Sequence, residues 1–131
     1  MQISAVVTSS PSHHTVSVRT GEKAQALAIP SRAAGGSGVN GGEFLMLALA
    51  TCYCNDLYRE AQRLGIALQQ VEVEATATFA GVGVAASDVR YRARVESSAS
   101  SAEVAQLLRE TDAVAEVHNT LRQGVPVQRV G

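Results

Sequence analysis

The chain has 131 residues, enough for one domain with a core of its own, since domains typically hold about 100–150 residues. Hydrophobic residues make up 46% of it and charged residues 18%, which excludes an intrinsically disordered protein. The chain has eleven basic and twelve acidic residues, a net charge of −1, so we expect neither a nucleic-acid partner nor a membrane-binding basic surface. Only 4% of the residues are aromatic, which also disfavours stacking on nucleic-acid bases.

The sequence shows neither a targeting segment nor the cysteine pattern of a secreted protein, and this predicts a location inside the cell. The longest apolar run, residues 44–50, is far shorter than the about twenty residues that span a bilayer. No basic segment followed by an apolar stretch opens the chain, so we see no signal peptide. The two cysteines, Cys52 and Cys54, are separated by one residue, which does not suit the disulfide framework of a secreted protein. We expect a single cytoplasmic domain, residues 1–131, with free thiols.

Three short antiparallel strands are predicted in the first thirty residues. Residues Ile3–Val7 and Thr15–Thr20 alternate apolar and polar side chains, and Ala24–Ile29 follows the turn at Gly21. A glycine-rich loop comes next, over residues 30–42, and its length suggests either a function or mobility.

The strongest helix prediction covers Glu43–Leu64, which contains no glycine or proline and is followed by Gly65. Its first half, residues 44–50, is apolar on every side, and such a helix must be buried all round. A domain of this size can hardly surround one helix completely. We therefore expect a second copy of the chain to cover part of it, in a homodimer.

The second half of the chain predicts a hairpin and further helical structure. Residues Val71–Ala80 and Val89–Glu96 alternate cleanly, and their polar faces carry glutamates on one strand and arginines on the other. These charges are expected to pair across the strands, with an anionic-ligand site as the alternative. Ser100 and Glu103 form a capping box for a helix over Ser101–Asp112.

The end of the chain is predicted to hold a turn or helix over Val114–Arg122 and then a short edge strand at Val125–Val127, where Pro126 cannot donate to a ladder. Strands that arrive in antiparallel runs between helices indicate the α+β class.

Cys52 and Cys54 are the candidate reactive residues. Side chains two positions apart on a helix point about 200° from each other, so neither a disulfide nor a metal clip is expected from this pair alone. Both can equally be small core residues. The helix turns polar just beyond Cys52, where Arg59 favours a thiolate and Asp56 opposes it.

Two motifs give the chain a family resemblance. The first runs from Asn40 to Leu45 and continues from Ala48 to Tyr53, and the second covers residues 117–127. Together, in this order and with these elements between them, they resemble the OsmC/Ohr superfamily of osmotically inducible and organic-hydroperoxide-resistance proteins. The resemblance covers essentially the whole chain. It implies an OsmC-like fold in an intertwined homodimer, with the long helix at its centre.

The resemblance also implies a thiol peroxidase, and it places Cys52 at the peroxide-attacking position. The resolving-cysteine position of the family falls at Ala115, which has no sulfur. The family glutamate that supports an activating arginine falls at Gly42, and Glu43 stands one position later. The activating arginine has no clear counterpart in the N-terminal hairpin.

Two functions follow from this comparison. In the first, Cys52 reduces organic hydroperoxides without a cofactor or metal, an external thiol completes the cycle, and Cys54 and Glu43 are further site residues. Cys54 is then expected to exchange with another subunit or a small thiol, or else only to pack. In the second, the protein is catalytically inactive and binds a small apolar or thiol ligand at the dimer interface. The reactivity of Cys52 separates the two.

Overall fold

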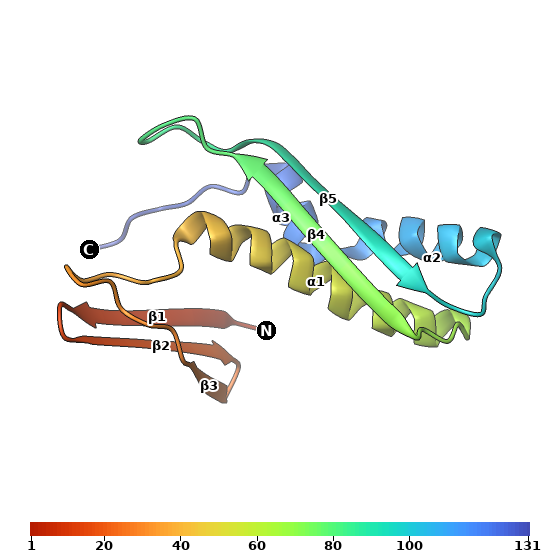
Figure 1. The fold of residues 1–131 in the computed structure, drawn as a ribbon, viewed down its shortest axis with the longest axis horizontal. Coiled ribbons are helices and arrows are strands. Elements are labelled where there is room, and N and C mark those ends of the chain that lie inside the picture. Colours follow the sequence, from red (N-terminus) through yellow and green to blue (C-terminus); the bar gives the residue numbers. More distant parts are fainter. The chain divides into compact units, whose positions relative to one another are not determined.

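The computed structural model describes residues 1–131 and contains the elements β1–β2–β3–α1–β4–β5–α2–α3 in chain order (Figure 1). Three helices and two antiparallel sheets confirm the predicted α+β class. The chain divides into two compact units, residues 1–44 and 45–131. One domain over the whole chain therefore stays a prediction.

The first unit is a three-stranded antiparallel sheet in the order β1 (Ile3–Ser10), β2 (His13–Thr20) and β3 (Lys23–Leu27), as predicted. Gly21 allows the tight turn between β2 and β3 because its φ of +57° is left-handed. Val16 is the one buried hydrophobic residue of the sheet, and β1 is exposed along its whole length. A sheet with so little buried apolar surface does not form a core by itself.

The helix α1 (Gly41–Leu64) begins two residues before the predicted start. The reason is a reciprocal cap: the Glu43 backbone N–H donates to Asn40 Oδ1 at 2.8 Å, and the Asn40 backbone N–H donates to Glu43 Oε1 at 3.0 Å. The cap lets Gly41 and Gly42 join the first turn. At the other end, Gly65 has a φ of +71° and terminates the helix as predicted.

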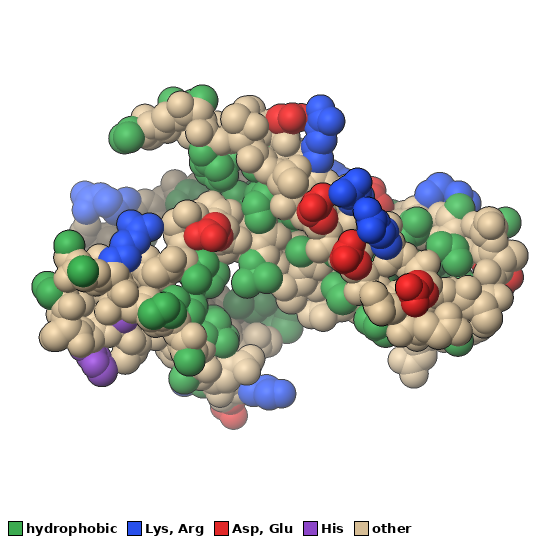
Figure 2. Space-filling view, in the orientation of Figure 1, with side chains coloured by type: hydrophobic (Ala, Val, Ile, Leu, Met, Phe, Trp, Pro, Cys, Tyr) green, Lys and Arg blue, Asp and Glu red, His purple; other side chains and the backbone are tan.

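The second unit contains the predicted hairpin of β4 (Gln70–Thr78) and β5 (Ser87–Glu96). Glu74 lies opposite Arg92 and pairs with it at 3.1 Å, and the pair next to it, Glu72 and Arg94, lies at 3.8 Å. Figure 2 shows acidic and basic side chains side by side over this hairpin. The predicted charge pairing across the strands is confirmed.

The other face of the hairpin packs on α1 and α2 (Ser101–Val114), followed by α3 (Glu116–Gln123). The capping box of Ser100 and Glu103 is present at the start of α2, as predicted. The core joins α1, α2 and the turn before α3, and its buried members are Tyr53, Leu57, Ala61, Ile66, Leu107 and Ala115.

One predicted element is absent from the structure, and one predicted feature of α1 is present in it. Residues 125–127 form no strand: Val125 and Val127 are exposed, and Pro126 has no N–H to donate to a ladder. In the apolar first half of α1 only Leu49 is buried, and Leu47 is 56% exposed. The chain by itself therefore does not provide the burial that this half of α1 requires. None of the helices combines the length and the apolar character that a bilayer-spanning segment needs.

Candidate thiol site

Cys52 lies midway along α1, where the apolar half of the helix gives way to the polar half. Leu49, Cys52 and Asp56 follow one another at intervals of three and four residues, so they share one face of the helix. That face is directed toward the core, because Leu49 and Asp56 are buried and Cys52 packs partly buried against the hydrophobic cluster. The thiol is thus held in a partly buried position.

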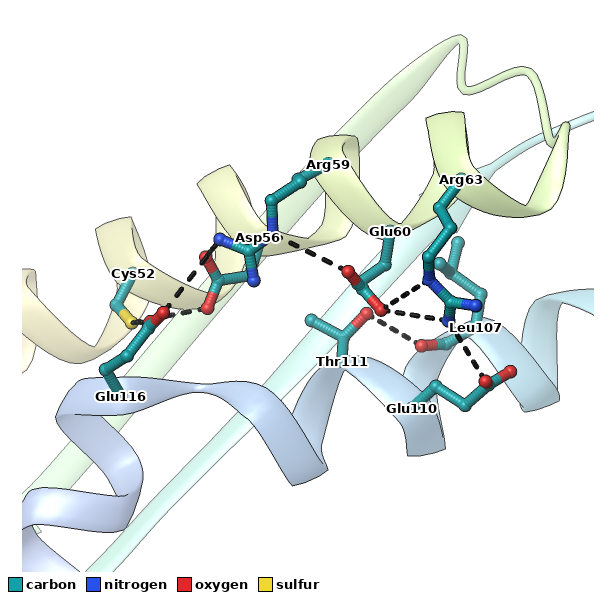
Figure 3. A network of polar contacts seen from close by, with 9 residues as sticks. All are labelled: Cys52, Asp56, Arg59, Glu60, Arg63, Leu107, Glu110, Thr111 and Glu116. Carbon is teal, nitrogen blue, oxygen red and sulfur yellow. Dashed lines mark hydrogen bonds and ion pairs between the residues drawn. The ribbon is translucent and has the colours of Figure 1, made fainter.

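The thiol has two carboxylate neighbours (Figure 3). Cys52 Sγ lies 3.7 Å from Asp56 Oδ2, one turn further along α1, and 3.8 Å from Glu116 Oε2 in the first turn of α3. A thiol has one proton, so it donates to one of these oxygens at a time. Both contacts favour the protonated form of the sulfur, since a thiolate would repel both carboxylates.

The surroundings raise the pKa of Cys52 above its ordinary value. Burial is the main cause, and the negative charges of Asp56 and Glu116 add to it. A hydrogen bond from the backbone of Val117 works in the opposite direction. Val117 lies in the first turn of α3, whose N-cap residue, Ala115, offers no side chain to cap the free N–H groups. The thiol therefore has one stabilising donor in its anionic form, against burial and two like charges.

Arg59 binds the carboxylates. Its Nη1 atom lies 2.8 Å from Asp56 Oδ1 and 4.0 Å from Glu116 Oε1. Burial still raises the pKa of Asp56, despite Arg59, whereas the pKa of Glu116 is lowered. Asp56 is therefore the more basic of the two carboxylates and the better proton acceptor. The expectation that Arg59 would favour a Cys52 thiolate needs this correction: the guanidinium charge is taken up by the two carboxylates.

The ionic network continues from Arg59 toward α2. Arg59 Nε lies 3.5 Å from Glu60 Oε2, and Arg63 then joins Glu60 and Glu110, each at 3.0 Å. Figure 3 shows this chain of contacts running along α1 above Thr111. The far end of the network links α1 to α2 through the ion pair of Arg63 and Glu110.

The same three side chains form a possible metal-ligand set. Ligand atoms of Cys52, Asp56 and Glu116 all lie within 4.8 Å of one another. Sulfur and carboxylate oxygen are both ligands of zinc. However, the Arg59 guanidinium already binds Asp56 at 2.8 Å, and its positive charge would oppose a cation at the same place. The arrangement suits a thiol with a proton acceptor better than a metal.

The other two candidate site residues lie apart from this thiol. Glu43 caps the start of α1, nine residues before Cys52, and this interval corresponds to about 13 Å of helix. The two side chains therefore do not meet along the helix. Cys54 is half-buried, and its helical position directs it about 200° away from Cys52. Both cysteines are free.

Sequence reasoning missed Glu116 and Val117 as neighbours of the thiol. One signal in the sequence could have found them. The family resemblance places the resolving cysteine at Ala115, and a cysteine there must lie close to Cys52 to form a disulfide, so the residues after it lie near Cys52 as well. The structure places Ala115 fully buried in the core cluster against which Cys52 packs. The start of α3 is therefore the part of the molecule that faces the thiol, and here its first turn supplies a carboxylate and a backbone N–H.

The sequence model of OsmC-like proteins matches residues 34–129, which include α1, the hairpin, α2 and α3. The chain belongs to the OsmC-like protein family. The resemblance seen in the two motifs is thereby confirmed. A comparison with curated protein sequences finds no significant match for this OsmC-like chain.

Solved structures share the fold of this OsmC-like protein. An OsmC-like protein from Mycoplasma pneumoniae is similar at a TM-score of 0.65 and 21% identity, over 95% of this chain and 87% of the other. An OsmC-like hydroperoxide resistance protein from Jannaschia sp. CCS1 has a TM-score of 0.59 and 14% identity, over 98% and 92%. An organic hydroperoxide resistance protein OsmC from Legionella pneumophila has a TM-score of 0.59 and 18% identity, over 98% and 94%.

Proposed function

We propose that this OsmC-like protein reduces organic hydroperoxides through Cys52, with an external thiol as the reductant. The observation that carries the proposal is the pairing of Cys52, at the family's attacking position, with a buried carboxylate 3.7 Å away on the same helix. Two proteins of the same fold, from Jannaschia and Legionella, are described as hydroperoxide resistance proteins, which supports the substrate class.

The first step transfers an oxygen atom to sulfur. Asp56 accepts the thiol proton while Cys52 Sγ attacks the distal oxygen of the hydroperoxide, and the O–O bond breaks. The departing alkoxide takes a proton from Asp56 and leaves as an alcohol, so Cys52 becomes a sulfenic acid and Asp56 returns to its starting state. The Val117 N–H stabilises the negative charge that the sulfur gains as its proton moves to Asp56.

The second step restores the thiol. Ala115 has no sulfur, so the sulfenic acid of Cys52 condenses with an external thiol, releasing water and forming a mixed disulfide. A second external thiol attacks that disulfide, releasing Cys52 and an external disulfide. In this scheme Cys54 assists only by exchange with the reductant, and Glu43 acts by fixing the start of α1.

The homodimer is part of the same proposal. The half-exposed apolar start of α1 and the β1–β3 sheet without a core support it, because both need apolar surface to cover them. The cytoplasmic location stays a prediction from the sequence.

A second candidate function is ligand binding without turnover at the dimer interface. The observation in its favour is the raised pKa of Cys52, which burial and two carboxylates keep protonated at neutral pH. A protonated, partly buried thiol without an activating cation behaves as an inert core residue.

The decisive experiment measures oxidation of Cys52. Reduced protein is mixed with cumene hydroperoxide or with hydrogen peroxide, and peptide mass spectrometry locates and counts the modified thiols over time. The proposal expects Cys52 to be oxidised once per chain, selectively, and faster by the organic peroxide than free cysteine is. Oxidation no faster than that of free cysteine would favour the ligand-binding candidate.

Two cysteine variants separate the roles of the thiols. Cys52→Ser should abolish peroxide consumption in the presence of a dithiol. Cys54→Ser should leave the first oxidation intact and only slow the recycling. Equal losses from both variants would contradict these roles.

A further inference from the structure

The second unit contains an apolar pocket that the thiol chemistry does not use. Its volume of about 430 Å³ lies within the range of about 300–1,000 Å³ that is usual for small-molecule sites. The walls come from α1, the hairpin and α3, and the lining residues are Leu45, Leu49, Ala86, Val89, Tyr91, His118, Leu121 and Arg122. All of them belong to the unit of residues 45–131.

His118 is the unexplained polar group of this pocket. The residue is only 3% exposed, and neither of its ring nitrogens has a hydrogen-bond partner. Its ring is held by Tyr91 in an edge-on contact with centroids 4.5 Å apart, and by Tyr53 at 5.7 Å. Leaving a buried polar group unpaired costs about 1–3 kcal/mol. A side chain that is fixed by aromatic packing and yet unpaired is suited to a partner that enters from the pocket.

The charges beside His118 cancel. Arg122 Nη2 binds Asp112 Oδ1 at 2.8 Å, and the Tyr91 hydroxyl donates to the same carboxylate. Arg122 holds the pKa of Asp112 below its ordinary value, so this carboxyl stays ionised. Burial and Arg122 lower the pKa of His118, which leaves a neutral imidazole with one donor and one acceptor. The polar end of the pocket therefore offers hydrogen bonds without net charge.

We propose that this pocket binds a small apolar molecule with one uncharged hydroxyl or carbonyl group, and that His118 hydrogen-bonds this group. The five apolar side chains of the lining enclose the body of the ligand, and burial of that body drives binding. A carboxylate ligand is disfavoured because Arg122 is already neutralised and Asp112 repels a second anion. The site does not depend on the reactivity of Cys52, so it stands or falls separately from the peroxidase.

Octan-1-ol and octanoate are suitable probes for the full-length protein. The chain has only three histidines, so nitrogen NMR signals of the imidazole rings can be assigned with the variant His118→Phe. Saturation with octan-1-ol should shift both ring nitrogens of His118 and leave those of His13 and His14 unchanged. Octanoate should bind at least tenfold more weakly, and His118→Phe should weaken octan-1-ol binding at least tenfold.

A pocket-filling variant tests the site without touching His118. Leu121→Trp should abolish the octan-1-ol shifts, whereas the matched control Val114→Trp should retain them, because Val114 is 40% exposed against 41% for Leu121 and does not line the pocket. The proposal is overturned by an unshifted His118 ring, by octanoate binding as tightly as octan-1-ol, or by full binding in Leu121→Trp.

Discussion

The sulfur of Cys52 lies 3.8 Å from a carboxylate oxygen of Glu116, although 64 positions separate the two residues in the chain. The residue before Glu116 is Ala115, where the family resemblance implies a resolving cysteine. The first residue of α3 thus presents a negative charge to the thiol, one position after the place where a second sulfur is expected. Burial raises the pKa of Cys52, and the negative charges of Asp56 and Glu116 add to this effect. Because residue 115 is an alanine, the proposed redox cycle needs an external thiol.

Alkylation of Cys52 should be slow at neutral pH and should accelerate well into the alkaline range. The thiolate is the reacting form, and the raised pKa of Cys52 means that this form accumulates only above the ordinary pKa of a cysteine. Iodide leaves without a proton, so the acid form of Asp56 gives no assistance in this reaction, unlike the reaction with a hydroperoxide. Rates of iodoacetamide labelling in the Cys54→Ser variant, measured from pH 6 to pH 10, check this. A plateau below pH 7 would contradict it.

Asp56→Asn should lower the pKa of Cys52, since it removes a negative charge next to the sulfur. A decrease of one pKa unit gives about tenfold more thiolate at pH values below the pKa. Alkylation at pH 8 should then be about tenfold faster, while oxidation by cumene hydroperoxide should be slower, because the proton acceptor is lost. The control is Glu60→Gln, which also removes a partner of Arg59 but has no contact with Cys52. Parallel changes in both reactions would exclude Asp56 as the acceptor.

The free energy of unfolding should fall as the pH rises above 10. Burial raises the pKa of Tyr53 to about 12, and its hydroxyl donates to the Leu108 carbonyl at 2.8 Å. Between the unfolded value of about 10 and this folded value, the folded state binds more protons, so stability decreases by about 1.4 kcal/mol per pH unit for this group. Urea denaturation at pH 8, 10 and 11 measures the slope. Tyr53→Phe should reduce this slope. Tyr58→Phe is the control and should leave the slope unchanged, because Tyr58 is 48% exposed. Equal slopes in the native protein and both variants would refute the role of Tyr53.

Leu47→Asp should convert the proposed dimer into a monomer. Leu47 is 56% exposed within the apolar first half of α1, and a charge there would have to be buried in the interface. Light scattering coupled to size-exclusion chromatography gives the mass directly. Val82→Asp is the control, because Val82 lies fully exposed in the loop between β4 and β5. A monomeric native protein would remove the homodimer from the proposed function.

Much of the fold followed from local patterns. Alternation over two strands predicted the hairpin together with its glutamate–arginine pairs, and the Ser100–Glu103 box located the start of α2. The start of α1 was placed two residues late because the cap formed by Asn40 and Glu43 outweighs the two glycines between them. The edge strand predicted at Val125–Val127 is absent, because a proline that suits an edge strand does not show whether a neighbouring strand is available to pair with it.

By itself, the sequence determined the α+β class, the order of the elements and the position of Cys52 on a long helix. These depend on caps, periodicity and motifs, all of which act over a few residues. Only the tertiary structure placed Glu116 and the Val117 N–H beside the thiol, bound Arg59 to the carboxylates, and enclosed an unpaired His118 in an apolar pocket. Contacts between α1 and α3 depend on how the hairpin and the helices pack, and side-chain packing across 64 residues is not encoded in any local spacing.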